Sequence, residues 1–192
     1  MMSKSFKKYV SKYIVLGSSE WAFVEERLER MSLSSRELLL EEGRICRHLY
    51  FLEEGLLRYF VWRDGQDITK FFTYGNIFFT SIRSFQKQLP ATENIQALED
   101  CQLLCIRFEH LLEIRKAIPQ WHLLTAAVIS EVQGWTEDLM VALQNETAQE
   151  RYRRMLNEQS ELSNRIPLKY LATFLGIAPE SLSRIRRQLA KG

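Results

Sequence analysis

RIPLKYLATFLGIAPESLSRIRRQLAKG, residues 165–192, is the stretch that decides the fold. Apolar residues recur three and four positions apart on both sides of Gly176, which predicts two short helices, about 168–175 and from Pro179 onward. Glycine accepts the positive φ that ends a helix, and proline suits the first turn of the next one because its missing N–H would be unpaired there. Small Ala172 lets the two backbones approach. The stretch therefore predicts a helix-turn-helix.

The second predicted helix has one apolar face and one mostly cationic face. Such a helix can enter the major groove of DNA, where arginine pairs with guanine edges and glutamate accepts from cytosine. Residues 165–192 hold six cations against one carboxylate, a net charge of +5; since the whole chain carries +2, residues 1–164 carry −3. The apolar face comprises Leu182, Ile185 and Leu189, and the outer face comprises Glu180, Arg184, Arg187 and Lys191.

This concentrated positive charge predicts duplex DNA as the partner. The alternative is a helical hairpin that packs on its own domain, with Glu180 and Arg184 as a solvated ion pair. Under the DNA interpretation, side chains that flank the outer face contact phosphates. The residues expected in that role are Lys169, Ser181, Ser183 and Arg186.

The composition allows one large domain, or a sensor with a small reader, in 192 residues of which 46% are apolar. No run approaches the roughly 18–20 apolar residues of a membrane span or the long apolar run of a signal peptide, so we expect a cytoplasmic protein. Cys46, Cys101 and Cys105 lack Cys-x-x-Cys spacing, which favours core positions over a disulfide or zinc cluster. Redox sensing by one of them is the alternative.

Enzymatic residue patterns are missing from the sequence. The three histidines, His48, His110 and His122, are scattered, and none belongs to a metal-ligand pair. The sequence has no nucleophile–base pairing and no phosphate-binding loop of the P-loop kind. We therefore expect neither an enzyme nor a metal site.

Residues 36–108 predict a β-rich sensor. Glycines spaced 12, 10 and 10 residues apart separate short apolar runs, which suits antiparallel strands closing into a roll. The clearest hairpin turns at Asp64-Gly65, and a last strand pair is expected at 93–98 and 102–108. The aromatic residues between 71 and 79 predict core packing, with a ligand pocket as the alternative.

A long helix is predicted from Pro119 to about Gln144. One apolar stripe repeats every 11 residues and is expected to face a second subunit, while Leu123, Ala127 and Met140 are expected to face the roll. The alternative is a single helix that covers its own roll. A capping box at Thr147 predicts a further helix to about Glu158 and then a polar connection. The expected dimer interface is Trp121, Leu124, Val128, Val132, Trp135, Leu139 and Leu143.

This order of elements resembles the cyclic-AMP receptor protein/FNR (Crp/Fnr) family of transcription regulators over about residues 18–190. The resemblance is carried by HLYFLEEGLLR at 48–58, TYGNIF at 73–78 and PLKYLATFLGIAPESLSRI at 167–185. It implies an α+β fold with an N-terminal double-stranded β-roll of the cyclic-nucleotide-binding type (a jelly roll). A long dimerisation helix and a C-terminal helix-turn-helix of winged-helix type would follow. The expected domains are the sensor at 1–117, the linking helix at 118–146 and the DNA-binding domain at 147–192.

The resemblance also implies a homodimer that binds promoter DNA, with RNA polymerase as a further partner and a small-molecule effector in the roll. Base-contact positions of the family match Glu180 and Arg184, and a third matches Pro179, which cannot read a base edge. The family's β-wing is missing after the second helix, so phosphate contacts are expected from the helices. An alternative function is a cyclic-nucleotide or other small-ligand sensor that acts through protein contacts.

The effector site departs from the family pattern. Nucleotide-binding members carry Gly-Glu-Leu and then Arg-[Ser/Thr]-Ala, and the ribose-binding carboxylate and phosphate-binding arginine are both missing here. We therefore expect no physiological binding of cyclic AMP, and the effector is unknown. Residues 1–45 hold no cysteine, which excludes the iron–sulfur branch. The matching effector-pocket positions are Phe79, Thr80, Ser81, Ala91, Thr92 and Thr136.

Overall fold

Two compact units make up the chain in a computed structural model, which describes residues 2–189. The first unit combines residues up to Tyr59 with Phe72–Val132, and the second combines Phe60–Phe71 with residues from Gln133 onward. The tip of the hairpin at Phe60–Phe71 thus belongs to the same unit as the C-terminal helices. This division differs from the expected domains, which end at residues 117 and 146. Those functional boundaries stay a prediction.

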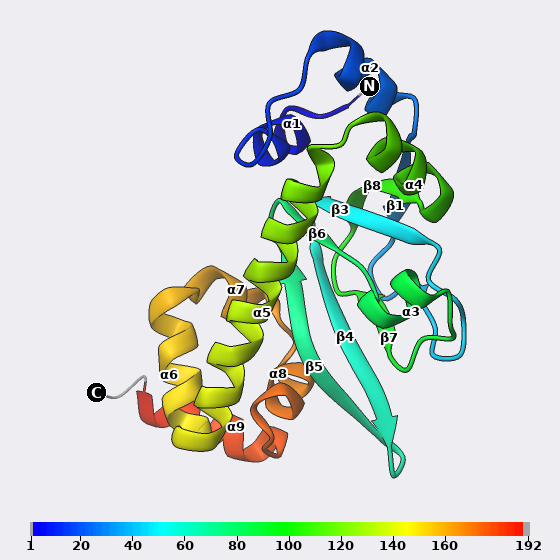
Figure 1. Ribbon diagram of the computed structural model, residues 1–192. Coiled ribbons are helices and arrows are strands. Elements are labelled where there is room, and N and C mark those ends of the chain that lie inside the picture. The colour runs from blue at the N-terminus through cyan, green and yellow to red at the C-terminus, as the bar shows by residue number, and fades with distance from the viewer. Residues whose placement is uncertain (1, 190–192) are drawn as a thin grey trace. The chain divides into compact units, whose positions relative to one another are not determined.

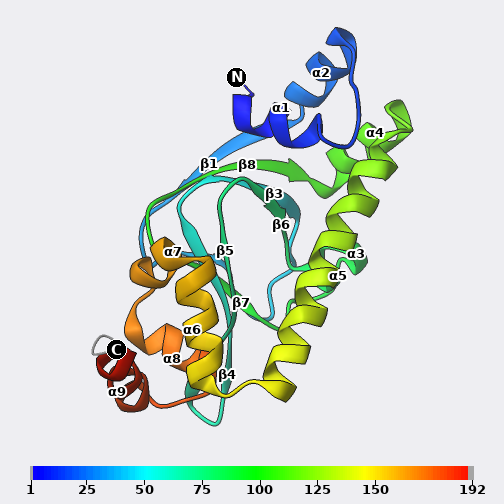
Figure 2. The same cartoon turned by 90° about the vertical axis from the view of Figure 1, so that its left-hand side faces the viewer.

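Two four-stranded antiparallel sheets form the β-roll, as predicted, among the described residues (Figure 2). One has the order β1-β8-β3-β6 and the other β2-β7-β4-β5. The core lies between the sheets and beneath the helices that cover the first sheet. The strands are β1 (Leu28–Leu33), β2 (Leu38–Leu40), β3 (His48–Glu54), β4 (Leu56–Arg63), β5 (Gln66–Tyr74), β6 (Ile77–Phe79), β7 (Asn94–Ala97) and β8 (Cys101–Arg107).

The hairpin of β4 and β5 is confirmed (Figure 1). Asp64 and Gly65 both have positive φ, 51° and 75°. Two successive left-handed residues are what a tight two-residue hairpin turn requires, and the Asp-Gly pair supplies them at low cost. Local sequence chemistry was sufficient to predict this element.

The expected pairing of the last two strands is wrong. β7 lies between β2 and β4, whereas β8 lies between β1 and β3 in the other sheet. The chain crosses between the sheets at residues 98–100, close to Gly55. A Cβ at Gly55, whose φ is +108°, would lie 2.5 Å from the Cys101 sulfur and 2.8 Å from the Asp100 carbonyl oxygen. Glycine is needed there because the two chain segments touch.

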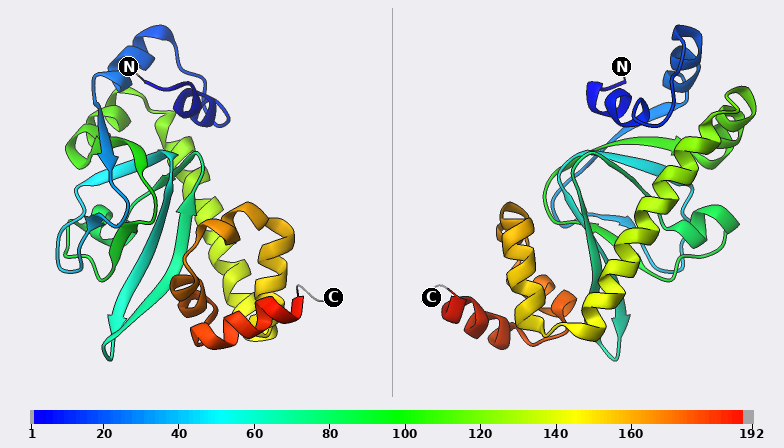
Figure 3. Two further views of the ribbon diagram at one scale, coloured as in Figure 1. Left: turned by 180° about the vertical axis from the view of Figure 1, so that it is seen from behind. Right: turned by 60° about the vertical axis from the view of Figure 1, so that its left-hand side comes forward.

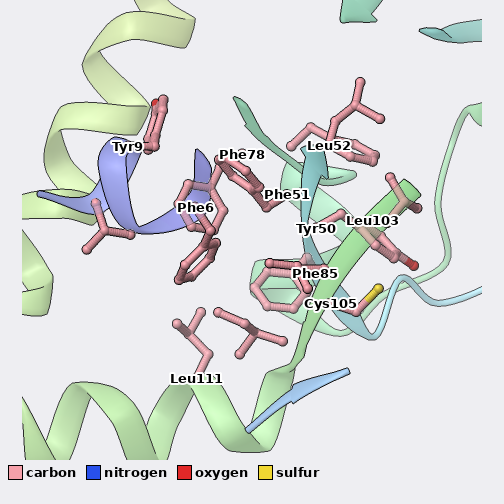
Figure 4. Packing of buried hydrophobic residues seen from close by; sticks show 14 of the residues in the cluster. Phe6, Tyr9, Tyr50, Phe51, Leu52, Phe78, Phe85, Leu103, Cys105 and Leu111 are labelled. Carbon is pink, nitrogen blue, oxygen red and sulfur yellow. The ribbon is translucent and has the colours of Figure 1, made fainter. Parts of the chain in front are cut away.

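The two faces of the β3–β6 pair carry different aromatic layers (Figure 4). Phe51 and Phe78 are cross-strand partners, and Phe6 packs edge-on against both at 5.3 and 5.5 Å between ring centroids. On the opposite face, Tyr50 stacks on Phe79 at 5.2 Å. The expected packing role is therefore confirmed for Phe78 and Phe79.

Four short helices accompany the strands of the first unit. The N-terminal helix α1 brings Phe6, Tyr9 and Val10 into the core, and all three are buried. After β6 the chain forms a short helix, α3, which exposes Arg83 and Lys87. The helices are α1 (Lys4–Val10), α2 (Ser18–Glu25), α3 (Ile82–Lys87) and α4 (Phe108–Ala117).

The long helix is α5 (Trp121–Asn145), and its burial corrects the expected orientation. Trp121 and Leu124 are 1% and 2% exposed and belong to the core of the roll, and Val128 packs against that core. Leu123 and Met140, expected to face the roll, are 49% and 56% exposed. Both stripes are apolar, so periodicity alone did not show which one the roll would cover. The first part of α5 thus covers its own roll.

As far as Leu189, where the described residues end, four helices follow α5 in the second unit (Figure 3). The Thr147–Glu150 capping box is present: the Glu150 N–H donates to the Thr147 hydroxyl, and the Thr147 N–H donates to the Glu150 carboxylate. The expected polar connection is a helix, because Leu162 and Ile166 are buried and anchor it. The helices are α6 (Ala148–Glu158), α7 (Ser160–Arg165), α8 (Leu168–Leu175) and α9 (Pro179–Leu189).

No helix among residues 2–189 is long and apolar enough to cross a membrane. Within the same residues, His, Cys, Asp and Glu side chains form no group of three that could hold a metal ion.

Candidate nucleic-acid interface and effector cassette

The α8–α9 pair is held together by a small apolar core. Leu171, Ala172, Leu175 and Leu182 are all buried, with exposures of 0–1%. Gly176 ends α8 with φ 71°, and its N–H donates to the Thr173 carbonyl at 3.1 Å. The predicted helix limits, the glycine cap and Pro179 in the first turn of α9 are all confirmed.

The outer face of α9 presents charged groups to solvent. Glu180, Arg184 and Arg187 are exposed. Among the described residues, Arg184 and Glu180 make no hydrogen bond or ion pair, so the solvated pair of the plainer interpretation is not formed. The Arg187 Nε lies 3.5 Å from the Ser183 carbonyl oxygen, at the limit of a hydrogen bond. The charged side chains of this face are therefore available to bind a partner.

Other predicted DNA contacts lie in different environments. Arg186 donates from Nε to the Tyr152 hydroxyl at 3.0 Å and lies over that ring, so it stabilises the packing of α9 on α6. Its expected role as a phosphate contact stays a prediction. Lys169 is exposed, with its ammonium 4.5 Å from the Tyr170 ring centroid. Pro179, Ser181 and Ser183 are half-buried at the rim of α9, and Lys191 lies outside the described residues.

Two contacts that position the helix-turn-helix were missed by the sequence analysis. Arg151 donates to the Glu146 carbonyl at 2.6 Å and to the Leu175 carbonyl at 2.8 Å, and so joins the ends of α5 and α8. The Thr69 N–H at the hairpin tip donates to the Thr173 hydroxyl at 3.2 Å. The bonds from Arg151 to Leu175 and from Thr69 to Thr173 link residues far apart in the sequence, so no local signal indicated them.

Five of the six predicted effector positions meet in one loop region of the first unit, which we call the cassette (residues 79–93). Phe79 is buried against Tyr50. The Thr80 hydroxyl donates to the His48 carbonyl at 2.9 Å and contacts the Cys46 sulfur at 3.2 Å. These side chains are engaged in packing and internal hydrogen bonds. The sixth position, Thr136, is exposed on the part of α5 that belongs to the second unit.

A carboxylate joins the two ends of the cassette. The Ser81 hydroxyl, which is buried, donates to Glu93 Oε1 at 2.6 Å, and the Thr92 hydroxyl donates to Glu93 Oε2 at 3.2 Å. Ala91, at the position of the family's phosphate-binding arginine, is 4% exposed. The cassette thus holds a negative charge of its own.

The one buried arginine among the described residues, Arg58, does not replace the missing cation. Its guanidinium donates from Nε and Nη2 to Gln96 Oε1 at 2.9 and 2.8 Å. Adjacent strand residues point to opposite faces, and its neighbour Tyr59 belongs to the roll core. Arg58 therefore lies on the outer face of β4, away from the interior where the family holds its effector.

A hollow of about 440 Å³ opens elsewhere in the first unit, beside β2 and β3. Leu38, Arg44, Cys46 and His48 are among the residues that line it, and no predicted effector position does. All three cysteines are buried, as expected for core positions. Burial raises the pKa of Cys105 to about 12, which disfavours the reactive thiolate.

Residues 30–117 match the family model of the cyclic nucleotide-binding domain. Solved structures share the architecture of the chain well beyond that segment. FixK2 from Bradyrhizobium japonicum has 19% sequence identity and a TM-score of 0.74, with 85% of each chain covered. The chain has the fold of the Crp/Fnr regulators. The predicted resemblance and fold class are both confirmed.

Two further structures extend the comparison. A protein assigned to the Crp/Fnr transcriptional regulators, from Eubacterium rectale, has 17% identity and a TM-score of 0.74; 98% of this chain and 88% of that one are covered. The c-di-GMP responsive global regulator CLP from Xanthomonas campestris has 15% identity and a TM-score of 0.73, with 91% and 92% covered. Comparison with curated protein sequences found no match.

Proposed function

We propose that the protein is a dimeric transcription regulator that reads duplex DNA with α9. The observation that carries this proposal is the outer face of α9, where Glu180, Arg184 and Arg187 are exposed while Leu182 on the opposite side is fully buried. A helix of this kind fits the major groove, and its arginines can pair with guanine edges. Lys169, on the adjacent helix α8, supplies a further cation for phosphates.

The exposed side of α5 supports a dimer. The residues that would form the interface differ in part from those expected. Ile129, Met140 and Leu143 are 38%, 56% and 52% exposed, and Val132 is half-buried. Their positions, with Thr136 between them, are spaced 3, 4, 4 and 3, which gives one stripe along the helix. Val132 and Leu143 remain from the expected interface, whereas Trp121 and Leu124 leave it because they are buried in the roll.

The remaining members of the expected interface lie beside this stripe. Trp135 is 53% exposed and Leu139 is half-buried, so both are available to border the contact. Exposed apolar side chains of this size along one helix favour a partner helix of the same kind. A two-fold dimer would present two copies of α9 to a palindromic site.

Selection from a random duplex library at two salt concentrations tests DNA reading. We expect a palindromic consensus, affinity that falls steeply with salt, and no enrichment by Arg184→Ala. A library with no enrichment, with or without added cell metabolites, would overturn the proposal. It would favour the alternative of a small-ligand sensor that acts through protein contacts.

Sedimentation of the full chain tests the dimer. Met140→Glu places a charge in the stripe and should convert dimers to monomers. Leu123→Glu is the matched control, because Leu123 is 49% exposed, close to the 56% of Met140, but lies on another side of α5. Equal effects of the two variants would contradict the assigned stripe.

The effector of this regulator is not cyclic AMP in our proposal, since the cassette lacks a cation at Ala91 and carries Glu93. Titration calorimetry should show no binding in the micromolar range, and binding in that range would contradict this part. A regulator of this kind acts on transcription through RNA polymerase, which we therefore propose as a further partner.

A further inference from the structure

We infer that the Glu93 carboxylate is a built-in anionic ligand of the cassette, tethered where the loop would otherwise hold the anion of an effector. The inference deepens the proposed function and rests on it for its regulatory meaning. Oε1 of this carboxylate accepts the Ser81 hydroxyl at 2.6 Å, and Oε2 accepts the Thr92 hydroxyl at 3.2 Å. A pair of hydroxyl donors converging on one anion is how a small phosphate or carboxylate is held, and charge-assisted bonds of this kind are stronger than neutral ones.

The hydrogen bonding of the Ser81 hydroxyl supports this assignment. Ser81 is the N-cap residue of α3, a position where a serine hydroxyl usually accepts from the first-turn N–H groups. Here it makes no capping bond and instead donates to Glu93, twelve residues later. Ser81 is only 2% exposed, so its hydroxyl needs an internal partner. The carboxylate provides that partner in place of the helix end.

Neighbouring backbone bonds close the cassette around this carboxylate. The Ala91 N–H donates to the Arg44 carbonyl, and the Gly43 N–H donates to the Ala91 carbonyl, both at 2.8 Å. The side chain of Asn94, which follows Glu93, accepts from the Glu42 N–H at 3.0 Å. The loop before β7 is therefore held on both sides of Glu93, and its carboxylate is presented to Ser81 by a fixed backbone.

Residues 79–93, all of them described, hold no buried cation that could pair with an incoming phosphate. The cations of residues 79–93 are Arg83 and Lys87, and both are exposed on α3. An incoming phosphate would meet the Glu93 charge and two hydroxyls already in use. Because its own side chain already occupies these donors, DNA binding does not depend on a phosphate-bearing effector.

Chemical rescue provides the test, with hydrogen exchange of the 81–88 amides in the full chain as the readout. Glu93→Ala should speed this exchange about tenfold, because the tie between α3 and β7 is lost. Acetate or inorganic phosphate at tens of millimolar should then restore protection, while neither anion should change the wild type. Glu54→Gln, an exposed charge change on β3, is the control and should behave as the wild type.

A second variant guards against misfolding of the first. Ser81→Ala removes the donor and leaves the carboxylate, so it should speed the same exchange but show no rescue by acetate or phosphate. The inference is overturned if folded Glu93→Ala exchanges like the wild type. It is also overturned if neither anion rescues Glu93→Ala, or if phosphate protects the wild type.

The regulatory part is measured separately with the DNA site selected by the wild type. Glu93→Ala should weaken DNA binding about fivefold or more, a typical coupling between distinct sites, and acetate should recover the loss. Unchanged DNA affinity in a variant that shows rescued exchange would overturn the regulatory part. A wild type that selects no DNA site would instead refute the proposed function, since the exchange and rescue measurements need no DNA.

Discussion

The helix-turn-helix and the cassette use polar side chains in opposite ways. On α9, Arg184 and Glu180 make no hydrogen bond or ion pair among the described residues and face solvent. In the cassette, Ser81 and Glu93 bond each other, and Thr80 bonds the carbonyl of His48. Groups left unsatisfied by the fold are available to a partner, whereas groups satisfied internally stabilise the fold. Under the proposed function, this difference describes a protein whose α9 side chains are available to DNA and whose cassette side chains are already bonded to one another.

This comparison predicts that substitutions in the cassette change stability, and that substitutions in the reader (helices α8 and α9) change DNA affinity. Phe79→Ala should give the largest effect, because it removes a buried ring stacked on Tyr50. The free energy of unfolding should fall by about 3–5 kcal/mol, measured by denaturant titration. The exposed change Lys87→Ala, on the neighbouring α3, serves as control and should stay within about 0.5 kcal/mol. A small loss for Phe79→Ala would mean that the cassette has room for a ligand.

In the reader, Arg184→Ala should weaken binding to the selected site by about 1–3 kcal/mol, roughly 5- to 150-fold, with little loss of stability. Arg186→Ala is the informative counterpart, because Arg186 is bonded to Tyr152. It should lower the melting temperature and affect DNA binding less. Binding curves on the consensus and on single-base variants check both. If Arg186→Ala weakened DNA binding more than Arg184→Ala, the base contact would belong to Arg186 and the assigned outer face of α9 would be wrong.

Lys169→Ala should give a smaller effect, confined to electrostatics. The exposed Lys169 ammonium is expected to contact a phosphate, so its loss should reduce the slope of log affinity against log salt by about 1. Preference among sequences should stay the same. A change in the consensus would instead assign Lys169 to base reading.

The smallest effect concerns Cys105 and the pH dependence of stability. It appears only at alkaline pH. Burial raises the pKa of this thiol from its ordinary 9.0 to about 12 in the folded chain. The unfolded chain therefore releases the proton first, and stability should be lost as the pH rises from about 9 through 12. Cys105→Ala should reduce that slope, as followed by melting temperature against pH. Identical slopes would show that Cys105 does not contribute.

Local chemistry made some elements predictable from the sequence. The Asp64-Gly65 turn and the Gly176 cap depend on backbone preferences of a few neighbouring residues. The stripe of α9 depends on spacing along one helix. Each was predicted because all of its determinants lie within about ten residues. The Crp/Fnr resemblance then placed them in one order.

Other features depended on segments far apart in the sequence. The sequence predicted two apolar flanks for α5, but only the roll, through its contact with Trp121 and Leu124, selected which one is buried. α7 was missed because its polar sequence gives little signal, and only burial of Leu162 and Ile166 fixes it.

The sequence by itself determined the hairpin turn, the two helices of the reader and the charge on its outer face, because these follow from local backbone preference and from period. Tertiary structure alone decided the pairing of β7 and β8 with different sheets, the buried flank of α5 and the bond between Ser81 and Glu93. Those depend on contacts between segments that the chain brings together only when the whole core packs, and pairwise contact of that kind leaves no periodic pattern in the sequence.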